Sequence, residues 1–216
     1  MSVIRSAAKV GGFTSISRIL GFVRDQLIAF TLGTSDVADA FFVAQRFPNL
    51  FRTLFAEGAF NSAFVPIFAG KVEAEGLPAA RNMAQDVYAA MLAWMVLFCA
   101  LCMAFMPWLI YLFAWGFQGS PQKMALVVGL TQLCFPYLLF MTLTALQGGV
   151  LNSLHRFTAA AAAPILLNIV LILSNGVAWL IGSGNSALTG YIFAGGVTLS
   201  GLAQYVLLAL ACRRAG

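Results

Sequence analysis

Three long stretches without a charged side chain constrain this sequence more than any other feature. They cover residues 87–117, 124–154 and 157–212. A helix that crosses a bilayer needs about 20 consecutive, mainly apolar residues. The first two stretches have room for one such helix each, and the third has room for two, divided at the glycine-rich segment 182–186. Since only 9% of the residues are charged, against about 25% in soluble domains, the sequence predicts an all-α integral membrane protein.

We expect about six transmembrane helices, which form a single domain over residues 1–216. The second helix is too long for a straight crossing, because at 1.5 Å per residue it would reach about 50 Å across a hydrocarbon core of about 30 Å. A proline removes a backbone donor, so Pro48 predicts a kink or break in this helix, and Pro107, Pro136 and Pro164 predict bends in later ones. The expected spans are 10–32, 37–70, 87–116, 124–151, 158–181 and 187–211.

The cationic side chains predict the orientation of the chain. With the N-terminus inside the cell, Lys123 lies on the outer side and the other loop cations lie inside. Cytoplasmic loops carry an excess of lysine and arginine, so we expect a cytoplasmic N-terminus, and a cytoplasmic loop with a short surface helix at 72–86. This bias accounts for the net charge of +5, and no nucleic-acid partner is expected. The inner cations are then Arg5, Lys9, Lys71, Arg81, Arg156, Arg213 and Arg214.

The remaining motifs do not indicate an enzyme. Cys99 and Cys102 form a C-x-x-C pair, but they lie in the middle of an apolar helix, where small buried packing residues are the better interpretation. The four cysteines have no metal-ligand spacing, and the sequence lacks the phosphate-loop, metalloprotease and serine-nucleophile patterns. We therefore expect neither catalytic residues nor a metal or cofactor site in this chain.

Charged residues within the membrane are concentrated in the first two spans. On a helical wheel, the polar side chains of each span fall on one face. The three charges of span 10–32 cost roughly 7 to 10 kcal/mol on the insertion scale, and its apolar side chains return roughly 5 kcal/mol. We therefore expect the polar face to line the interior of the bundle or a water-filled cavity. The charged residues are Arg18, Arg24 and Asp25 in the first span and Asp39, Arg46, Arg52 and Glu57 in the second.

Two interpretations of these charges stay open. In the first, Arg18 or Arg24 pairs with Asp39 or Glu57 across the two helices. In the second, the surplus guanidinium groups bind an anion, since the two spans hold four arginines and three carboxylates. Arginine suits a phosphate because it donates two parallel hydrogen bonds and stays charged when it is desolvated. We favour the second interpretation, because buried ion pairs contribute little net stability.

Several ordered motifs resemble those of one known family. The first is 17–25; the second runs through 39–44, 48–52, 55–60 and 63–66; and the third combines 149–157 with 163–168. These motifs resemble the MurJ/MviN family of lipid II flippases, within the multidrug/oligosaccharidyl-lipid/polysaccharide exporter superfamily. The resemblance extends over nearly the whole chain.

The resemblance implies a substrate and a set of binding residues. It implies transport of lipid II, the undecaprenyl-diphosphate-linked peptidoglycan precursor, across the bacterial inner membrane by alternating access. It also implies that Arg18, Arg24 and Arg52 hold the diphosphate and sugar headgroup. Asp39 would tune this charge or help to gate the outer side, and Asn49 falls in the matching motif. The implied partners are lipid II and the membrane lipid.

The resemblance also implies a longer protein with two six-helix lobes. This chain corresponds to the N-terminal lobe, so we expect a truncated, split or partial chain whose C-terminal lobe is on the same or a separate polypeptide. The resemblance places a sodium site only in that second lobe. Two alternatives remain, namely another polysaccharide-lipid or drug exporter of the same superfamily, and a membrane scaffold that transports nothing.

Overall fold

The computed structural model describes residues 3–52, 59–114, 116 and 119–215. Within these ranges the chain forms nine α-helices and no strand, which confirms the predicted all-α class. The helices are α1 (Val3–Leu32), α2 (Asp36–Arg52), α3 (Ala59–Glu75), α4 (Leu77–Ala104), α5 (Met106–Phe113), α6 (Pro121–Cys134), α7 (Pro136–Ser153), α8 (Phe157–Leu180) and α9 (Ala187–Ala215).

Four helical segments are long and apolar enough to cross a membrane. They are α4, the combined segment Pro121–Ser153, α8 and α9. The predicted count of six is therefore approximate. Helices α2 and α3 have 17 residues each, which is short of the roughly 20 that one crossing needs. Helix α1 is continuous over 30 residues, but charged side chains interrupt its apolar sequence.

Prolines affect the helices differently at each position. Pro136 is the first residue of α7 and Pro107 the second residue of α5, so both lie where a missing backbone donor costs little. In contrast, α2 continues through Pro48 and α8 through Pro164. Helix α2 therefore passes Pro48 without a break and ends at Arg52, and α3 begins at Ala59. The kink that was the other expectation at Pro48 stays a prediction.

At 72–86, where a loop with a short surface helix was predicted, two long helices meet instead. Helix α3 extends to Glu75 and α4 begins at Leu77, so both helices continue through this segment. Gly76, with φ of 84°, is the residue between them. Its missing side chain permits this left-handed conformation at little cost. The turn predicted at 182–186 is confirmed, since Gly182 and Gly184 adopt φ of 64° and 54° between α8 and α9.

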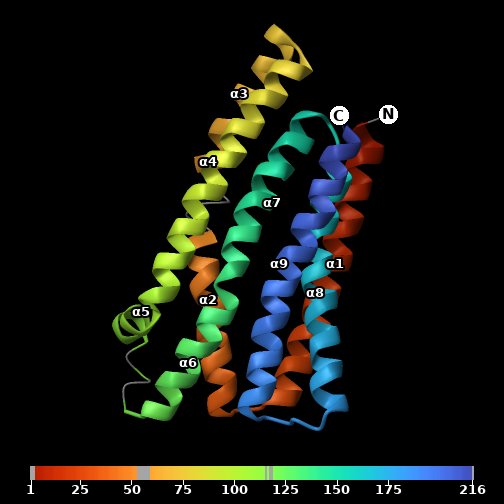
Figure 1. Ribbon diagram of the computed structural model, residues 1–216. Helices are drawn as coiled ribbons and strands as arrows, with labels where there is room; N and C mark the ends of the chain where they lie inside the picture. The colour runs from red at the N-terminus through yellow and green to blue at the C-terminus, as the bar shows by residue number, and fades with distance from the viewer. Residues whose placement is uncertain (1–2, 53–58, 115, 117–118, 216) are drawn as a thin grey trace.

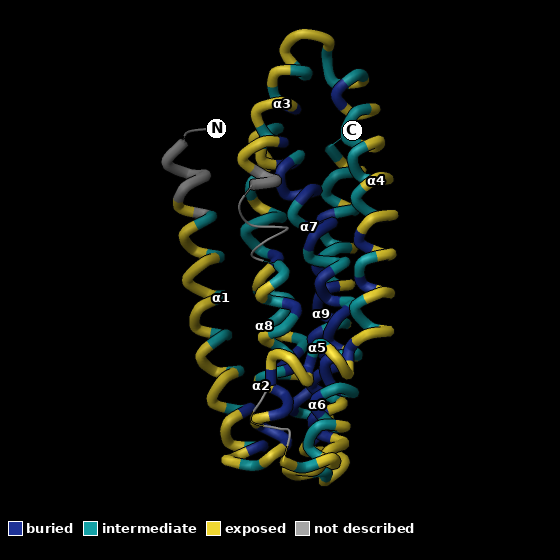
Figure 2. The backbone as a smooth tube through the Cα atoms, turned by 90° about the vertical axis from the view of Figure 1, so that its left-hand side faces the viewer, coloured by how far each residue is buried: buried dark blue, intermediate teal, exposed yellow. Residues whose placement is uncertain are grey.

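The helices pack as a bundle in which α7 and α9 are central (Figure 1). Helix α7 contacts α3 and α4 on one side and α9 on the other, whereas α2 packs on α6, α9 and α7. Helix α1 lies at the edge, where its main neighbour is α8, and most of its surface is exposed (Figure 2). The main core lies between α2, α6, α7 and α9 and contains Phe41, Leu130, Phe135, Leu138 and Phe193.

Glycines of α9 allow its neighbours to approach closely. A Cβ at Gly201 would lie 2.8 Å from Cδ2 of Tyr137 on α7, and one at Gly190 would lie 2.9 Å from Cγ1 of Val37 on α2. Such separations are too short for carbon atoms, so only glycine fits without a shift of these neighbours. Small residues at helix contacts are typical of membrane proteins, in which close packing replaces the hydrophobic effect.

We predict that Gly201→Ala destabilises the bundle. The added methyl group must displace the Tyr137 ring, and overpacking of this kind costs about 1 to 3 kcal/mol. Gly176→Ala in α8 is the matched control, because a Cβ there meets no atom within 4 Å. The control should be neutral or stabilising, since alanine favours a helix over glycine by about 1 kcal/mol. The measurement is the thermal unfolding midpoint in detergent micelles, and equal midpoints for both variants would contradict the packing argument.

Candidate functional site

Arg24, one of the predicted site residues, has side-chain partners on two helices. Its side chain is 18% exposed on α1. The guanidinium Nε and Nη2 donate to Oδ1 of Asp25 at 2.9 and 2.7 Å, and Nη1 donates to Oδ1 of Asn168 on α8 at 2.7 Å. A carboxylate and an amide therefore hold the guanidinium from two sides.

Asn168 was not predicted as a site residue. It is 4% exposed, and its Nδ2 donates to the backbone oxygen of Ser17 at 2.8 Å and to Ser17 Oγ at 3.3 Å. Asn168 thus connects α8 both to Arg24 and to the part of α1 two turns earlier. The sequence contains a feature that indicates such a residue, namely an amide within a charge-free span, where polar side chains connect helices.

A second asparagine of α8 also holds α1. Asn175 is 7% exposed, and its Nδ2 donates to the backbone oxygen of Leu27 at 3.0 Å and to Thr31 Oγ1 at 2.9 Å. Asn168 and Asn175 are seven residues apart, so they lie on the same face of the helix. Two amide contacts two turns apart therefore fix α1 along α8.

The predicted ion pairs between the first two helices do not form with Asp39. Asp39 lies exposed in the first turn of α2, and Arg18 lies exposed on α1. In the described part of the chain, the salt bridge of Arg24 is to its neighbour Asp25. The reason is the packing, because α1 follows α8 while α2 follows α6 and α9. Glu57, the other predicted acidic partner, lies outside the described residues.

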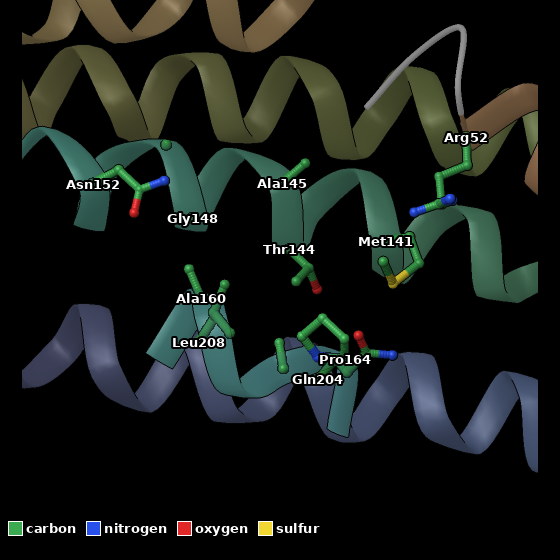
Figure 3. Close-up of a pocket in the computed structure, with 12 residues that line it drawn as sticks. Arg52, Met141, Thr144, Ala145, Gly148, Asn152, Ala160, Pro164, Gln204 and Leu208 are labelled. Atoms are coloured by element: carbon green, nitrogen blue, oxygen red, sulfur yellow. The ribbon is translucent and has the colours of Figure 1, made fainter. Parts of the chain in front are cut away.

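Arg52 contributes to the wall of a cavity of about 270 Å³. It is the last residue of α2, and its Nε is buried. Figure 3 shows Arg52 at one end of the cavity and Asn152 at the other, with Thr144 and Gly148 of α7 facing Pro164, Gln204 and Leu208. The other predicted residues, Asp39, Arg18, Arg24 and Asn49, do not line this cavity.

Polar groups of α7 and α9 lie within this cavity wall. Thr144 is 6% exposed, and its Oγ1 has no hydrogen-bond partner among the described residues. Gln204 is buried, and its Nε2 donates to the backbone oxygen of Ser200 at 3.2 Å. Small residues such as Gly148, Gly149 and Ala163 leave the space open. The cavity therefore combines a guanidinium, a hydroxyl and two amides, those of Gln204 and Asn152, in an otherwise apolar setting.

Helix α8 connects the surroundings of the two arginines. Pro164 lines the cavity of Arg52, and Asn168, four residues later, binds Arg24. Residues four apart on a helix lie one turn from each other. One turn of α8 therefore both binds Arg24 and lines the cavity of Arg52, although α1 and α2 pack on different neighbours.

Comparison with known proteins agrees with this architecture. The family model described as "Lipid II flippase MurJ" matches residues 28–216, which is most of the chain. The chain belongs to the MurJ family. The proteins of this family that it resembles are named lipid II flippases, which are membrane transporters and not enzymes.

Two relatives and one solved structure illustrate the match to MurJ. A "Probable lipid II flippase MurJ" of Rhizobium meliloti is 44% identical over 217 residues, which cover 100% of this chain and 40% of the relative. The "Lipid II flippase MurJ" of Burkholderia cenocepacia is 40% identical over 173 residues, which cover 80% of this chain and 33% of the relative. A structure of "Lipid II flippase MurJ, inward closed conformation" superposes with a TM-score of 0.72 at 27% identity, over 92% of this chain and 41% of that one. The matched part of the chain thus spans 33 to 41% of the length of these three proteins.

We predict that Asn168→Ala and Asn175→Ala loosen different parts of α1. Each removes a buried amide that spans two helices, at a cost of about 1 to 3 kcal/mol. Hydrogen–deuterium exchange should become faster around Ser17 to Arg24 in the first variant and around Leu27 to Thr31 in the second. The two variants serve as controls for each other. Identical exchange patterns would show that the amides do not act locally.

Proposed function

We propose that this MurJ lobe forms one half of a cavity that carries the lipid II headgroup across the inner membrane by alternating access. The observation that carries the proposal is the cavity of about 270 Å³ beside Arg52, in which Thr144 Oγ1 is buried without a partner among the described residues. A buried hydroxyl of this kind is satisfied when a ligand fills the cavity. A guanidinium at the same wall selects an anionic ligand such as a diphosphate.

Arg24 is suited to a second contact with the headgroup. Asp25 and Asn168 fix its orientation before any ligand arrives. A preorganised group loses less conformational freedom on binding, and this raises affinity. Arg18 lies on the same helix and is exposed, so it can contact a headgroup that approaches α1 from outside the lobe. In this proposal Asp39 modulates the positive charge from the first turn of α2, and Asn49, in the last turn of that helix, also contacts the headgroup.

The size of the cavity supports a role for a second lobe. About 270 Å³ lies below the range of roughly 300 to 1,000 Å³ that is typical of sites for drug-sized ligands. A diphosphate fits such a volume, whereas a glycopeptide headgroup needs more space. We therefore propose that a C-terminal lobe covers the exposed face of α1 and completes the cavity, and that any sodium site belongs to that lobe.

The arrangement of the helix ends supports the proposed orientation. The N-terminus, the C-terminus, the connection of α3 to α4 and that of α7 to α8 lie at one end of the bundle (Figure 1). The predicted inner cations occur in these segments, whereas Lys123 lies near the start of α6 at the other end. We propose that the end with both termini is cytoplasmic, in agreement with the positive-inside rule.

The decisive test is binding of lipid II to the purified chain in detergent micelles, measured by native mass spectrometry. We predict that Arg24→Ala and Arg52→Ala each weaken binding about 10- to 100-fold, because a hydrogen bond to a charged group contributes about 1.5 to 3 kcal/mol. Arg46→Ala is the matched control, since Arg46 lies exposed on α2 away from the cavity wall. The control should bind as the unmodified chain does.

Other outcomes would favour the alternatives. Equal losses in all three variants would indicate attraction by net charge and not a headgroup site. Tight binding of an unrelated lipid-linked saccharide in preference to lipid II would favour another exporter of the superfamily. A scaffold predicts that a thiol placed at the exposed position Thr14 stays inaccessible to aqueous reagents in the membrane, whereas a cavity predicts labelling.

A further inference from the structure

A second, larger cavity lies on the opposite side of α7 from the Arg52 cavity. It has a volume of about 400 Å³ and lies between α4, α7 and α9, near the end of the bundle with both termini. We call it the α4–α9 groove. Helix α7 contacts both other helices and so forms its floor. The polar residues of its wall are Arg81, Gln85 and Tyr88 of α4, Gln147 of α7, and Tyr205 and Arg213 of α9.

The groove has a cationic end and an inner end closed by tyrosines. The hydroxyl groups of Tyr88 and Tyr205 form a hydrogen bond of 2.6 Å from α4 to α9. Tyr88 lies seven residues after Arg81, and Tyr205 lies eight residues before Arg213, so each tyrosine is about 10 to 12 Å deeper than its arginine. The two arginines therefore lie at the outer end, toward the helix termini. The rest of the described lining is apolar and contains no carboxylate.

Gln147 supplies an independent indication of a ligand. The residue is 8% exposed, and its Oε1 is buried without a hydrogen-bond partner among the described residues. The Cys212 Sγ contacts the backbone oxygen of Gln147 at 3.7 Å, which places Gln147 at the depth of the turn that carries Arg213. A buried acceptor without a donor is unfavourable by about 1 to 3 kcal/mol. A ligand that brings a hydroxyl group to this depth would remove that cost.

We propose that the α4–α9 groove binds a phospholipid of the adjacent leaflet with an anionic headgroup that carries a hydroxyl group, of which phosphatidylglycerol is the simplest. Arg81 and Arg213 bind its phosphate, a glycerol hydroxyl donates to Gln147, and the apolar lining contacts the start of an acyl chain. Basic pockets between transmembrane helices are known to suit anionic headgroups. A headgroup with an ammonium ion is disfavoured by the two nearby arginines. This proposal uses neither Arg24 nor Arg52, so it is independent of the proposed transport function.

The test is native mass spectrometry of the chain in detergent micelles, titrated with phosphatidylglycerol, phosphatidylcholine or inorganic phosphate. We expect preferential binding of phosphatidylglycerol that inorganic phosphate does not displace. The double variant Arg81→Gln/Arg213→Gln should bind it roughly 30-fold more weakly, since each basic side chain near the surface contributes about 1 kcal/mol. Arg214→Gln is the matched control, because Arg214 is adjacent, equally charged and outside the lining. It should change binding no more than about twofold.

Two further variants keep every charge. Ala209→Trp fills the groove and should remove the bound lipid as the double arginine variant does. Gln147→Leu should reduce the preference for phosphatidylglycerol over phosphatidic acid, which lacks the headgroup glycerol and its hydroxyl groups. Far-UV circular dichroism checks that each variant is folded. Equal binding of phosphatidylglycerol and phosphatidylcholine, displacement by inorganic phosphate, or equal effects of the Arg81→Gln/Arg213→Gln and Arg214→Gln variants would each overturn the proposal.

Discussion

A guanidinium group that is largely shielded from solvent is stable only where its donors have partners, and the contact of Arg24, whose side chain is 18% exposed, with Asn168 meets this requirement. The contact determines which helix lies beside α1. Because Asn168 and Asn175 both donate to α1, the helix aligns with α8 and not with its sequence neighbour α2. Because α1 packs mainly on α8, it lies at the edge of the bundle with most of its surface exposed.

Much of the fold could be predicted because the membrane imposes simple rules. The long charge-free stretches correspond to α4, the α6–α7 pair, α8 and α9, and the turn at Gly182 and Gly184 lies where it was expected. The rule for prolines was less reliable. It predicts that a donor is lost, but it does not predict whether the helix ends there, as before Pro136, or continues, as at Pro48. That outcome depends on packing.

The candidate site was harder to predict than the fold. The sequence identifies Arg24 and Arg52 as unusual, because each is a charge within an apolar span. It does not show that their surroundings come from α8, α7 and α9, since these contacts join residues more than 100 positions apart for Arg24. Asn168 and Thr144 are therefore absent from a list based on charge alone, although they are the groups that orient or accompany the two arginines.

The separation of Arg24 from Asn168 has a consequence for biosynthesis. The two residues are 144 positions apart in the sequence. At a synthesis rate of about 5 to 20 residues per second, the translating ribosome needs roughly 7 to 30 s to reach Asn168 after Arg24 has been made. During this interval the first helix lacks the neighbour that holds its guanidinium group. Until then Asp25, which is made directly after Arg24, is the neighbour that can already accept hydrogen bonds from this guanidinium group.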